Sequence, residues 1–487
     1  WFLLICTQKC TSYDNAYQYF LNLHSWKDMF DLILVDYSPP LYSVVLKLYT
    51  SFFGTGIIAY RSLSLILLCS QFFLAFFPIR RIFGKTCSYV AAILFLTSSY
   101  NFYFGVAIRP TILAFALTTA MFVYAVSAYT EGKLSELIKF SAFSILCMYT
   151  HNVSLIAAFC IYATTIILAL IRKNMDVFKK FLISGVSVAL LFIPWLIVLL
   201  TQMGNVSDHF WSSNDTWPYA LYLALLGFVG NLKSGLLAMP VLLFIFVLPL
   251  INIIVFIKKD KLKTARSVLE LFEIKDIKKG WQNTGKIIYL LMLIVISVTA
   301  FYLVTEFVAP IFARRYFYIF SGAGIVVLSG LATLCKNKKF PAVIISVLCL
   351  LSFMVNTVSE MQIIRMSDRD RMVADITAMT DGKIQFIDFY EEALGVSSYY
   401  FPDAKHYVTD EIFTVLPNFD VFGDNTTYLH NGDDVWDYTD EVYIFSAFDF
   451  ELSQLDPYEF YEYYFNTPEN ITIEEIVKVI FKIMRGK

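Results

Sequence analysis

A polar segment with four aspartates precedes a long series of apolar segments in this chain. It runs from residue 14 to residue 42, contains Asp14 and Asp36, and ends in the string DYSPPLY. A transporter or channel usually buries its ionisable groups at the middle of the membrane, whereas these two carboxylates precede the first apolar segment. Their position therefore favours catalysis at a membrane surface.

Basic and imidazole side chains recur at the ends of later apolar segments. Arg109 and His151 each stand just before an apolar run, and Arg314 and Arg315 stand together before another. A guanidinium at headgroup depth matches the oxygens of a lipid phosphate, because its planar donors form paired hydrogen bonds. The structural alternatives are snorkelling to lipid headgroups for the two adjacent arginines and a hydrogen-bonded core histidine for His151.

The composition is that of a multi-span membrane protein. Hydrophobic residues make up 58% of the chain and charged residues 16%, and apolar runs of about 20 residues recur, which is the length of a membrane-crossing helix. The pattern predicts ten spans, at residues 57–79, 87–106, 110–130, 138–150, 153–171, 181–201, 236–257, 286–305, 316–334 and 340–358.

The connections between these spans alternate in charge. Every second connection is rich in lysine and arginine, and residues 258–286 alone carry nine basic residues. Such loops face the cytoplasm, so residues 1–56, the connections that contain His151 and Arg314, and the C-terminal region face outward. A basic linker tethered at both ends to the bilayer favours contact with anionic lipid over nucleic acid.

The chain opens on Trp1, and its first ten residues are apolar but too few to cross a bilayer. We therefore expect one further span upstream, which would bring the number of spans to eleven and place the N-terminus inside. A processed or designed fragment is the alternative interpretation.

The C-terminal region differs from the rest of the chain. Residues 359–487 hold 26 of the 40 acidic residues and 9 of the 38 basic ones. Alternating apolar patterns at 383–390 and 441–445 are typical of short strands, and those at 369–379 and 472–484 are typical of helices. We expect a membrane domain over 1–358, with residues 1–56 as its first outer loop, and then a small acidic α/β domain outside the membrane.

The sequence predicts no metal-ligand set. All eight cysteines lie in or near predicted spans, and the five histidines are dispersed. Their spacing matches no common metal site, and the chain contains neither a phosphate-binding Walker loop nor a dinucleotide fingerprint. A requirement for a divalent metal is left open.

Several short motifs follow one another in an order that resembles the polyprenyl- and dolichyl-phosphate-sugar-dependent glycosyltransferases of the C-type fold. The closest likeness is to the protein mannosyltransferase-like, family 39-like group. The motifs are Asp14, the DYSPPLY string, YRSLS at 60–64, IRP at 108–110, YTH at 149–151 and ARRY at 313–316. The resemblance covers nearly all of residues 1–400, although each motif alone has a structural explanation, such as proline at a helix start.

The resemblance implies the C-type fold and an inverting transfer of a hexose or pentose at the outer membrane face. Such a reaction needs a base for the acceptor hydroxyl and cations for the phosphate leaving group. The resemblance makes Asp14 the catalytic base and Arg314 and Arg315 the donor phosphate ligands. It makes three further residues substrate-binding, namely Asp36, Arg109 and His151.

The chain departs from the family pattern at two positions, Asn15 and Ser38. The family commonly has a second carboxylate where this chain has Asn15, and a histidine or lysine where it has Ser38. Both departures weaken the case for a metal in this loop. The structural alternatives are a helix cap for Asp14 and a turn for Asp36.

The implied donor is a sugar on undecaprenyl or dolichyl phosphate, and no nucleic acid is expected as a partner. The acceptor is left open as a glycan, a lipid or a protein, and so is the oligomeric state. The chain contains no obvious retention signal and no appended repeat domain, which favours a prokaryotic plasma membrane with the active site and C-terminal domain extracytoplasmic. The alternative functions are a transporter or flippase of a lipid-linked glycan and a non-catalytic scaffold.

Overall fold

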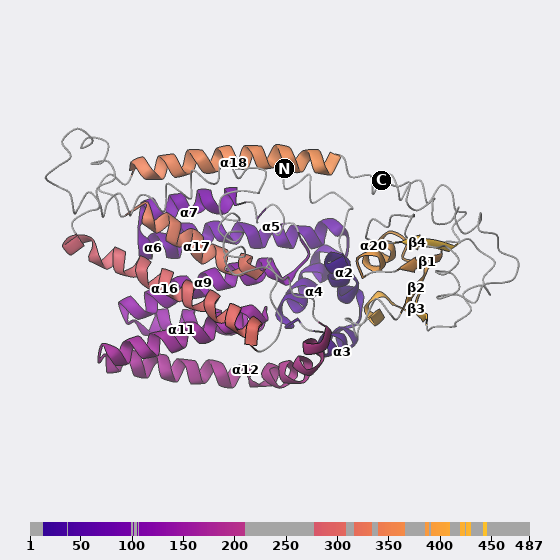
Figure 1. Ribbon diagram of the computed structural model, residues 1–487, viewed down its shortest axis with the longest axis horizontal. Coiled ribbons are helices and arrows are strands. Elements are labelled where there is room, and N and C mark those ends of the chain that lie inside the picture. The colour runs from indigo at the N-terminus through magenta and orange to yellow at the C-terminus, as the bar shows by residue number, and fades with distance from the viewer. Residues whose placement is uncertain are drawn as a thin grey trace, which may run out of the picture. The chain divides into compact units, whose positions relative to one another are not determined.

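The chain folds as two compact units in the computed structural model (Figure 1). Unit 1 comprises Trp1–Phe2, Ser38–Val45 and Arg61–Met361, and unit 2 comprises Leu3–Tyr37, Leu46–Tyr60 and Gln362–Lys487. The structure describes residues 13–36, 38–98, 101, 105, 107–209, 277–307, 316–333, 339–365, 385–388, 391–409, 419–423, 425–429 and 442–445.

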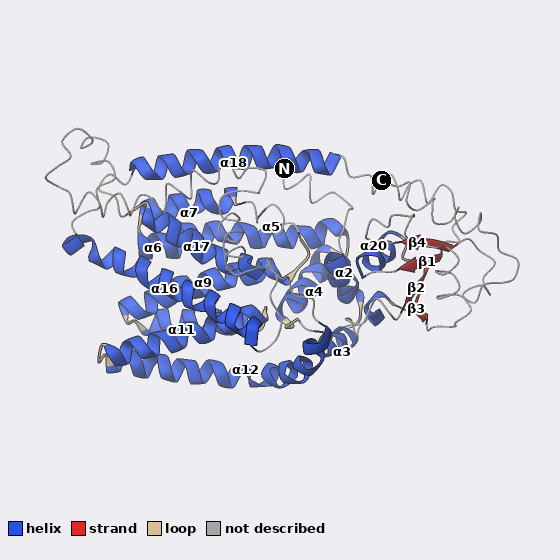
Figure 2. Cartoon of the chain, viewed as in Figure 1, coloured by secondary structure: helices blue, strands red, loops and turns tan. Residues whose placement is uncertain are grey.

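The described part of unit 1 is helical (Figure 2). In chain order its elements are most of α5 (Ile57–Leu74), the π-helix η1 (Ala75–Ile79), α6 (Arg80–Phe83), α7 (Lys85–Thr97), α9 (Pro110–Glu131), α10 (Leu134–Met148), α11 (Asn152–Ile171), α12 (Met175–His209), α16 (Ile277–Phe307), α17 (Phe317–Leu331) and most of α18 (Lys339–Arg365).

Five of the described helices are long and apolar enough to cross a membrane. They are Ile57–Phe83, Pro110–Glu131, Asn152–Ile171, Met175–Gln202 and Gly285–Phe307. Each predicted span among the described residues coincides with a helix, and the span predicted at 236–257 lies outside the described residues. The chain is therefore a mainly α, multi-pass membrane protein, which confirms that prediction. The upstream span and the domain boundary at residue 358 stay predictions.

Helix α9 forms the core of unit 1. Most of its surface is covered by neighbouring helices, among them α10 and α17, so it is apolar on all sides. A Cβ atom on Gly322 of α17 would lie 1.8 Å from Oγ1 of Thr119 on α9, so this approach requires glycine. Small residues allow such close contact between membrane helices, where burial of apolar surface supplies little driving force.

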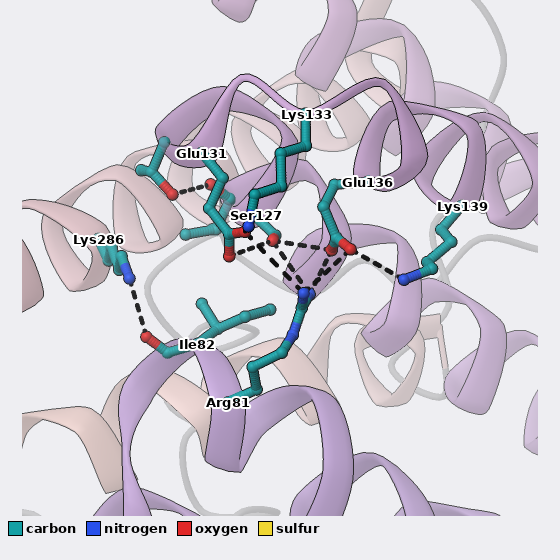
Figure 3. Close-up of polar contacts among 10 residues, drawn as sticks. Arg81, Ile82, Ser127, Glu131, Lys133, Glu136, Lys139 and Lys286 are labelled. Atoms are coloured by element: carbon teal, nitrogen blue, oxygen red, sulfur yellow. Dashed lines mark hydrogen bonds and ion pairs between the residues drawn. The ribbon is translucent and has the colours of Figure 1, made fainter.

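An ionic cluster joins α6, α9 and α10 (Figure 3). Arg81 donates two hydrogen bonds to the buried carboxylate of Glu136, one of them 3.0 Å long from Nη1 to Oε1. Lys139 Nζ donates to the same Oε1 at 2.8 Å, and the Ser127 hydroxyl lies 2.8 Å from Oε2 of Glu136 and 3.0 Å from Oε1 of Glu131. The buried carboxylate is thus compensated on both oxygens.

Two lysines connect this cluster region with further helices. Lys286 of α16 donates to the carbonyl oxygen of Ile82 at 3.0 Å, and Lys180 of α12 donates to that of Gly132 at 3.0 Å. Both carbonyls lie at ends of helices, where backbone oxygens lack a partner in the helix. The predicted cytoplasmic ends of five elements are therefore joined by charged side chains.

Unit 2 combines the first helices of the chain with C-terminal segments. The helices are α2 (Tyr13–Leu23), α3 (Trp26–Val35), most of α4 (Leu41–Phe53), α20 (Glu391–Tyr400) and the 3-10 helix η4 (Phe419–Phe422). The strands β1 (Gln385–Asp388), β2 (Lys405–Thr409), β3 (Thr426–Leu429) and β4 (Val442–Phe445) form a parallel sheet in the order β3-β2-β1-β4. Two helices predicted at 369–379 and 472–484 lie outside the described residues.

Aromatic contacts bring α2 against the C-terminal elements of unit 2. The ring of Tyr19 meets that of Tyr399 edge to face, with centroids 5.2 Å apart. Tyr17 and Phe20 both meet Phe422, at 6.4 and 5.4 Å. Such aromatic pairs contribute stability beyond that from the burial of their apolar surface. Helix α2 thus packs with the C-terminal elements of unit 2, an association that was not predicted from the sequence.

We expect Glu136→Leu to lower the free energy of unfolding by about 1–3 kcal/mol, because Arg81 and Lys139 would lose their carboxylate partner. Asp176→Asn is the matched control, since that carboxylate is 70% exposed in its pair with Lys180 and should matter by less than about 0.5 kcal/mol. Thermal unfolding of the purified protein in detergent measures both. Equal melting temperatures for the two variants would contradict a stabilising role of the cluster.

Candidate active site

A backbone hydrogen bond joins two of the sequence motifs within unit 1. The N–H of Leu41, at the start of α4, donates to the carbonyl oxygen of Tyr149 at 3.0 Å. The first N–H groups of a helix have no partner inside the helix. Here the Tyr149 carbonyl is the acceptor for one of them. The turn that follows Pro39–Pro40 is thereby fixed to the segment that leads into His151.

His151 caps the N-terminus of α11. Its Nδ1 accepts a hydrogen bond of 3.2 Å from the backbone N–H of Val153, which assigns the ring proton of a neutral imidazole to Nε2. The His151 and Tyr316 rings pack edge to face, with centroids 4.9 Å apart and planes at 73°. His151 therefore has a structural role as a cap, which the sequence analysis did not foresee.

Tyr316 links His151 with the predicted phosphate-binding motif. Arg314 and Arg315 lie outside the described residues, but Tyr316 follows them directly and forms the N-cap of α17. Tyr316 also contacts Phe301 of α16, with ring centroids 6.3 Å apart. The start of α11 and the start of α17 thus lie side by side, and the role of the two arginines stays a prediction.

Arg109 forms the N-cap of α9 and has extended backbone angles, φ −146° and ψ 152°. Pro110 accounts for this, because a residue before proline avoids the helical conformation and proline itself suits the first helical position. The Arg109 side chain is 9% exposed, and that of Arg61 on α5 is 4% exposed. Buried guanidinium groups in a membrane protein are costly, which makes each a candidate for binding an anion.

A side-chain hydrogen bond connects the motifs that contain Arg61 and Arg109. The hydroxyl of Ser64 on α5 donates to the carbonyl oxygen of Ala107 at 2.6 Å. Ala107 lies two residues before Arg109, and Ser64 lies three residues after Arg61. The YRSLS and IRP motifs, which are 44 residues or more apart in sequence, therefore meet in unit 1.

The two predicted carboxylates belong to unit 2. Asp14 lies in the first turn of α2 and is half-buried, in a position where the helix dipole stabilises a negative charge. Asp36 is the C-cap of α3, where its N–H donates to the carbonyl oxygen of Leu32 at 3.0 Å, and it is 9% exposed. Asp14 thus lies near the start of a helix, and Asp36 ends one. Their catalytic and substrate-binding roles stay predictions.

Lys47 and Asn22 fix the helix that carries Asp14. Lys47 Nζ donates to the carbonyl oxygens of Asn22, at 2.9 Å, and of His24, and it lies 5.5 Å from the ring centre of Trp26. Burial lowers the pKa of Lys47. The Asn22 amide donates to Thr50 Oγ1 and to the Tyr60 hydroxyl. Neither residue was predicted from the sequence. The signal that could have indicated Lys47 is that it is the sole charged residue among positions 41–53.

Among the residues that the structure describes, no three histidine, cysteine, aspartate or glutamate side chains are grouped so that they could hold a metal ion. The candidate residues of unit 1 are thus arginine, histidine and tyrosine, and the two candidate carboxylates belong to unit 2.

No protein-family model and no curated protein matches the chain. The chain is similar to the crystal structure of ArnT from Cupriavidus metallidurans in the apo state, with 11% identity, 85% of each chain covered and a TM-score of 0.46. It is similar to the same protein bound to undecaprenyl phosphate, with 14% identity, 85% coverage of each chain and a TM-score of 0.46. This likeness is too distant to assign a function.

We expect Lys47→Met to lower the free energy of unfolding by about 1–2 kcal/mol, because the carbonyls of Asn22 and His24 would lose a charged donor. Hydrogen exchange at the amides of residues 22–26 should be faster in this variant than in the wild type. The control is Lys27→Met, whose ammonium is 82% exposed in its pair with Asp31 and whose loss should change little. If both variants exchange as slowly as the wild type, Lys47 does not fix this turn.

Proposed function

We propose that the chain is an inverting glycosyltransferase that moves a hexose or pentose from a polyprenyl-phosphate donor to an acceptor hydroxyl at the outer membrane face. One observation carries the proposal. Motifs far apart in sequence meet in unit 1 at the predicted outer ends of helices, through the Leu41–Tyr149 bond, the His151–Tyr316 contact and the Ser64–Ala107 bond. A group of such residues at the predicted outer ends of helices suits a phosphate at headgroup depth.

The proposed reaction needs one base and one anion-binding group. Asp14 takes the proton of the acceptor hydroxyl while the hydroxyl oxygen attacks the anomeric carbon. The bond between that carbon and the phosphate oxygen breaks, and its electron pair leaves with the lipid phosphate. Arg109, Arg314 and Arg315 stabilise the charge that develops on the phosphate. Because attack comes from the face opposite the phosphate, the anomeric configuration inverts.

The remaining site residues hold the substrate and the loop around it. Asp36 orients the turn before Pro39–Pro40, and His151 contacts the substrate from the start of α11. The donor carrier is undecaprenyl or dolichyl phosphate. The acceptor is a glycan, lipid or protein outside a prokaryotic plasma membrane, where the C-terminal domain also lies.

The distribution of charge favours an enzyme over a transporter or flippase. In α9 the sole charged residue is Glu131 at the C-terminal end, and α11 contains none. Arg109 and Arg172 flank these helices at their N-cap and C-cap. A transporter is expected to have ionisable residues or a broken helix at mid-membrane depth.

Asp14→Asn should reduce sugar transfer by about 10²–10⁴-fold, because the amide cannot accept the proton of the acceptor hydroxyl. The assay incubates the purified full-length chain in liposomes with a panel of radiolabelled polyprenyl-phosphate sugars. Asp31→Asn on the neighbouring helix is the control, since Asp31 forms an exposed pair with Lys27. Wild-type turnover by Asp14→Asn would overturn the assignment of the base.

Arg109→Gln should raise the KM for the lipid donor by about tenfold to a hundredfold, because hydrogen bonds to charged groups contribute about 1.5–3 kcal/mol. Arg109→Lys should recover part of this, since lysine keeps the charge but loses the paired donors. The control is Arg172→Gln, because Arg172 is the C-cap of a different helix, α11. The phosphate-binding role of Arg109 fails if the donor KM is the same in all four proteins.

A further inference from the structure

We propose that Asn101 and Tyr318 are positioning residues for Arg109, and this inference rests on the proposed function. They hold the chain at Asn101, in the segment between α7 and α9 that ends at Arg109. Neither residue is needed for contact with the substrate, because both act through the backbone that carries the guanidinium.

The connection runs from Ser98 to Arg109 and begins with local hydrogen bonds. The N–H of Ser98 donates to the carbonyl oxygen of Leu94 at 2.9 Å, and that of Asn101 donates to Ser98 at 3.1 Å. The N–H of Gly105 donates to the Asn101 carbonyl at 3.1 Å. A Cβ atom at Gly105 would lie 2.4 Å from that same carbonyl oxygen, so the turn requires glycine.

Asn101 ties this connection to two helices. Its side-chain amide nitrogen donates to the carbonyl oxygen of Phe95 in the last turn of α7. Its side-chain oxygen accepts a hydrogen bond of 2.8 Å from the hydroxyl of Tyr318 on α17. Asn101 is 1% exposed. Because a buried amide without partners is costly, the Asn101 side chain is expected to keep these two hydrogen bonds.

Tyr318 is itself held by α9. Its ring stacks on that of Phe115, with centroids 4.4 Å apart and planes at 10°. Tyr318 is fully buried and lies in the first turn of α17, so neither the ring nor the hydroxyl can move far. The hydroxyl therefore acts as a fixed point for Asn101.

A second fixed point lies close to Arg109. The Ser64 hydroxyl holds the Ala107 carbonyl from α5, as described above, and Pro110 restricts the backbone of Arg109 itself. The connection is thus held at Asn101 from α17 and at Ala107 from α5. Releasing either point should let the Arg109 backbone move and weaken its alignment with a phosphate, where a small displacement costs much affinity.

The chain offers a matched control for the loss of one buried tyrosine hydroxyl. Tyr289 of α16 is also buried, and its hydroxyl lies 2.5 Å from Thr165 Oγ1 on α11. Tyr289→Phe removes a bond of the same type between other helices. A purely structural effect should therefore be the same in Tyr289→Phe and Tyr318→Phe, whereas an effect through Arg109 should appear in Tyr318→Phe alone.

The experiment compares the full-length wild type with Tyr318→Phe, Ser64→Ala and Tyr289→Phe in liposomes, titrating the radiolabelled polyprenyl-phosphate sugar that the wild type uses. We expect Tyr318→Phe and Ser64→Ala to raise the donor KM about tenfold with a smaller change in kcat, and Tyr289→Phe to leave KM unchanged. Tyr318→Phe should add nothing to Arg109→Gln, because the two changes remove the same contact. Full additivity, or an unchanged KM in Tyr318→Phe, overturns the inference.

Hydrogen exchange separates this inference from the proposed function. Tyr318→Phe and Ser64→Ala should each accelerate exchange at the amides of Gly105 and of residues 107–109 about tenfold, and Tyr289→Phe should not. This outcome does not depend on any sugar transfer. If exchange accelerates but neither the wild type transfers sugar nor Arg109→Gln alters donor binding, the proposed function fails while the positioning of Arg109 stands. If exchange is unchanged, the positioning role fails even in an active enzyme.

Discussion

The constraint that shapes this protein is the lack of water inside a bundle of apolar helices. A polar group there must find its partner within the chain, because the cost of leaving it unpaired is several kcal/mol. Several buried side chains of unit 1 follow this rule, although those of Gln71 and Ser88 do not. Ser64 bonds to a backbone carbonyl, Asn101 to both a carbonyl and a tyrosine, and Thr165 to Tyr289. Each of these bonds joins one helix to another segment, so the same pairs that satisfy polar groups also fix the bundle.

The same constraint sets the place where chemistry is possible. Charged side chains gather at helix ends, with the Arg81–Glu136 cluster at the predicted cytoplasmic ends and Arg109 at a predicted outer end. The Arg81–Glu136 cluster is compensated internally and suits a structural role. At the predicted outer ends, His151 contacts Tyr316, which follows Arg315 in the sequence.

Unit 2 adds a second level of organisation. Helix α2 carries Asp14 at its first turn, while Lys47, Asn22 and the rings around Phe422 fix the rest of that helix. The candidate base is therefore carried by a helix whose other end is held by polar bonds and aromatic packing. A carboxylate carried on a helix fixed in this way is held in one orientation.

The sequence by itself determined the class of the protein, the positions of the described spans and the start of a helix at Pro110. Those features depend on apolar length and on the proline that follows, which are local properties. Only the tertiary structure decided that Leu41 meets Tyr149, that His151 meets Tyr316 and that Tyr318 holds Asn101, 217 residues away. It also decided that α2 packs with η4. Apolar helices have similar surfaces on every side, so their sequences do not specify which neighbour each one meets; that choice comes from the close fit of side chains such as Gly322 on Thr119 and from the few polar bonds between them.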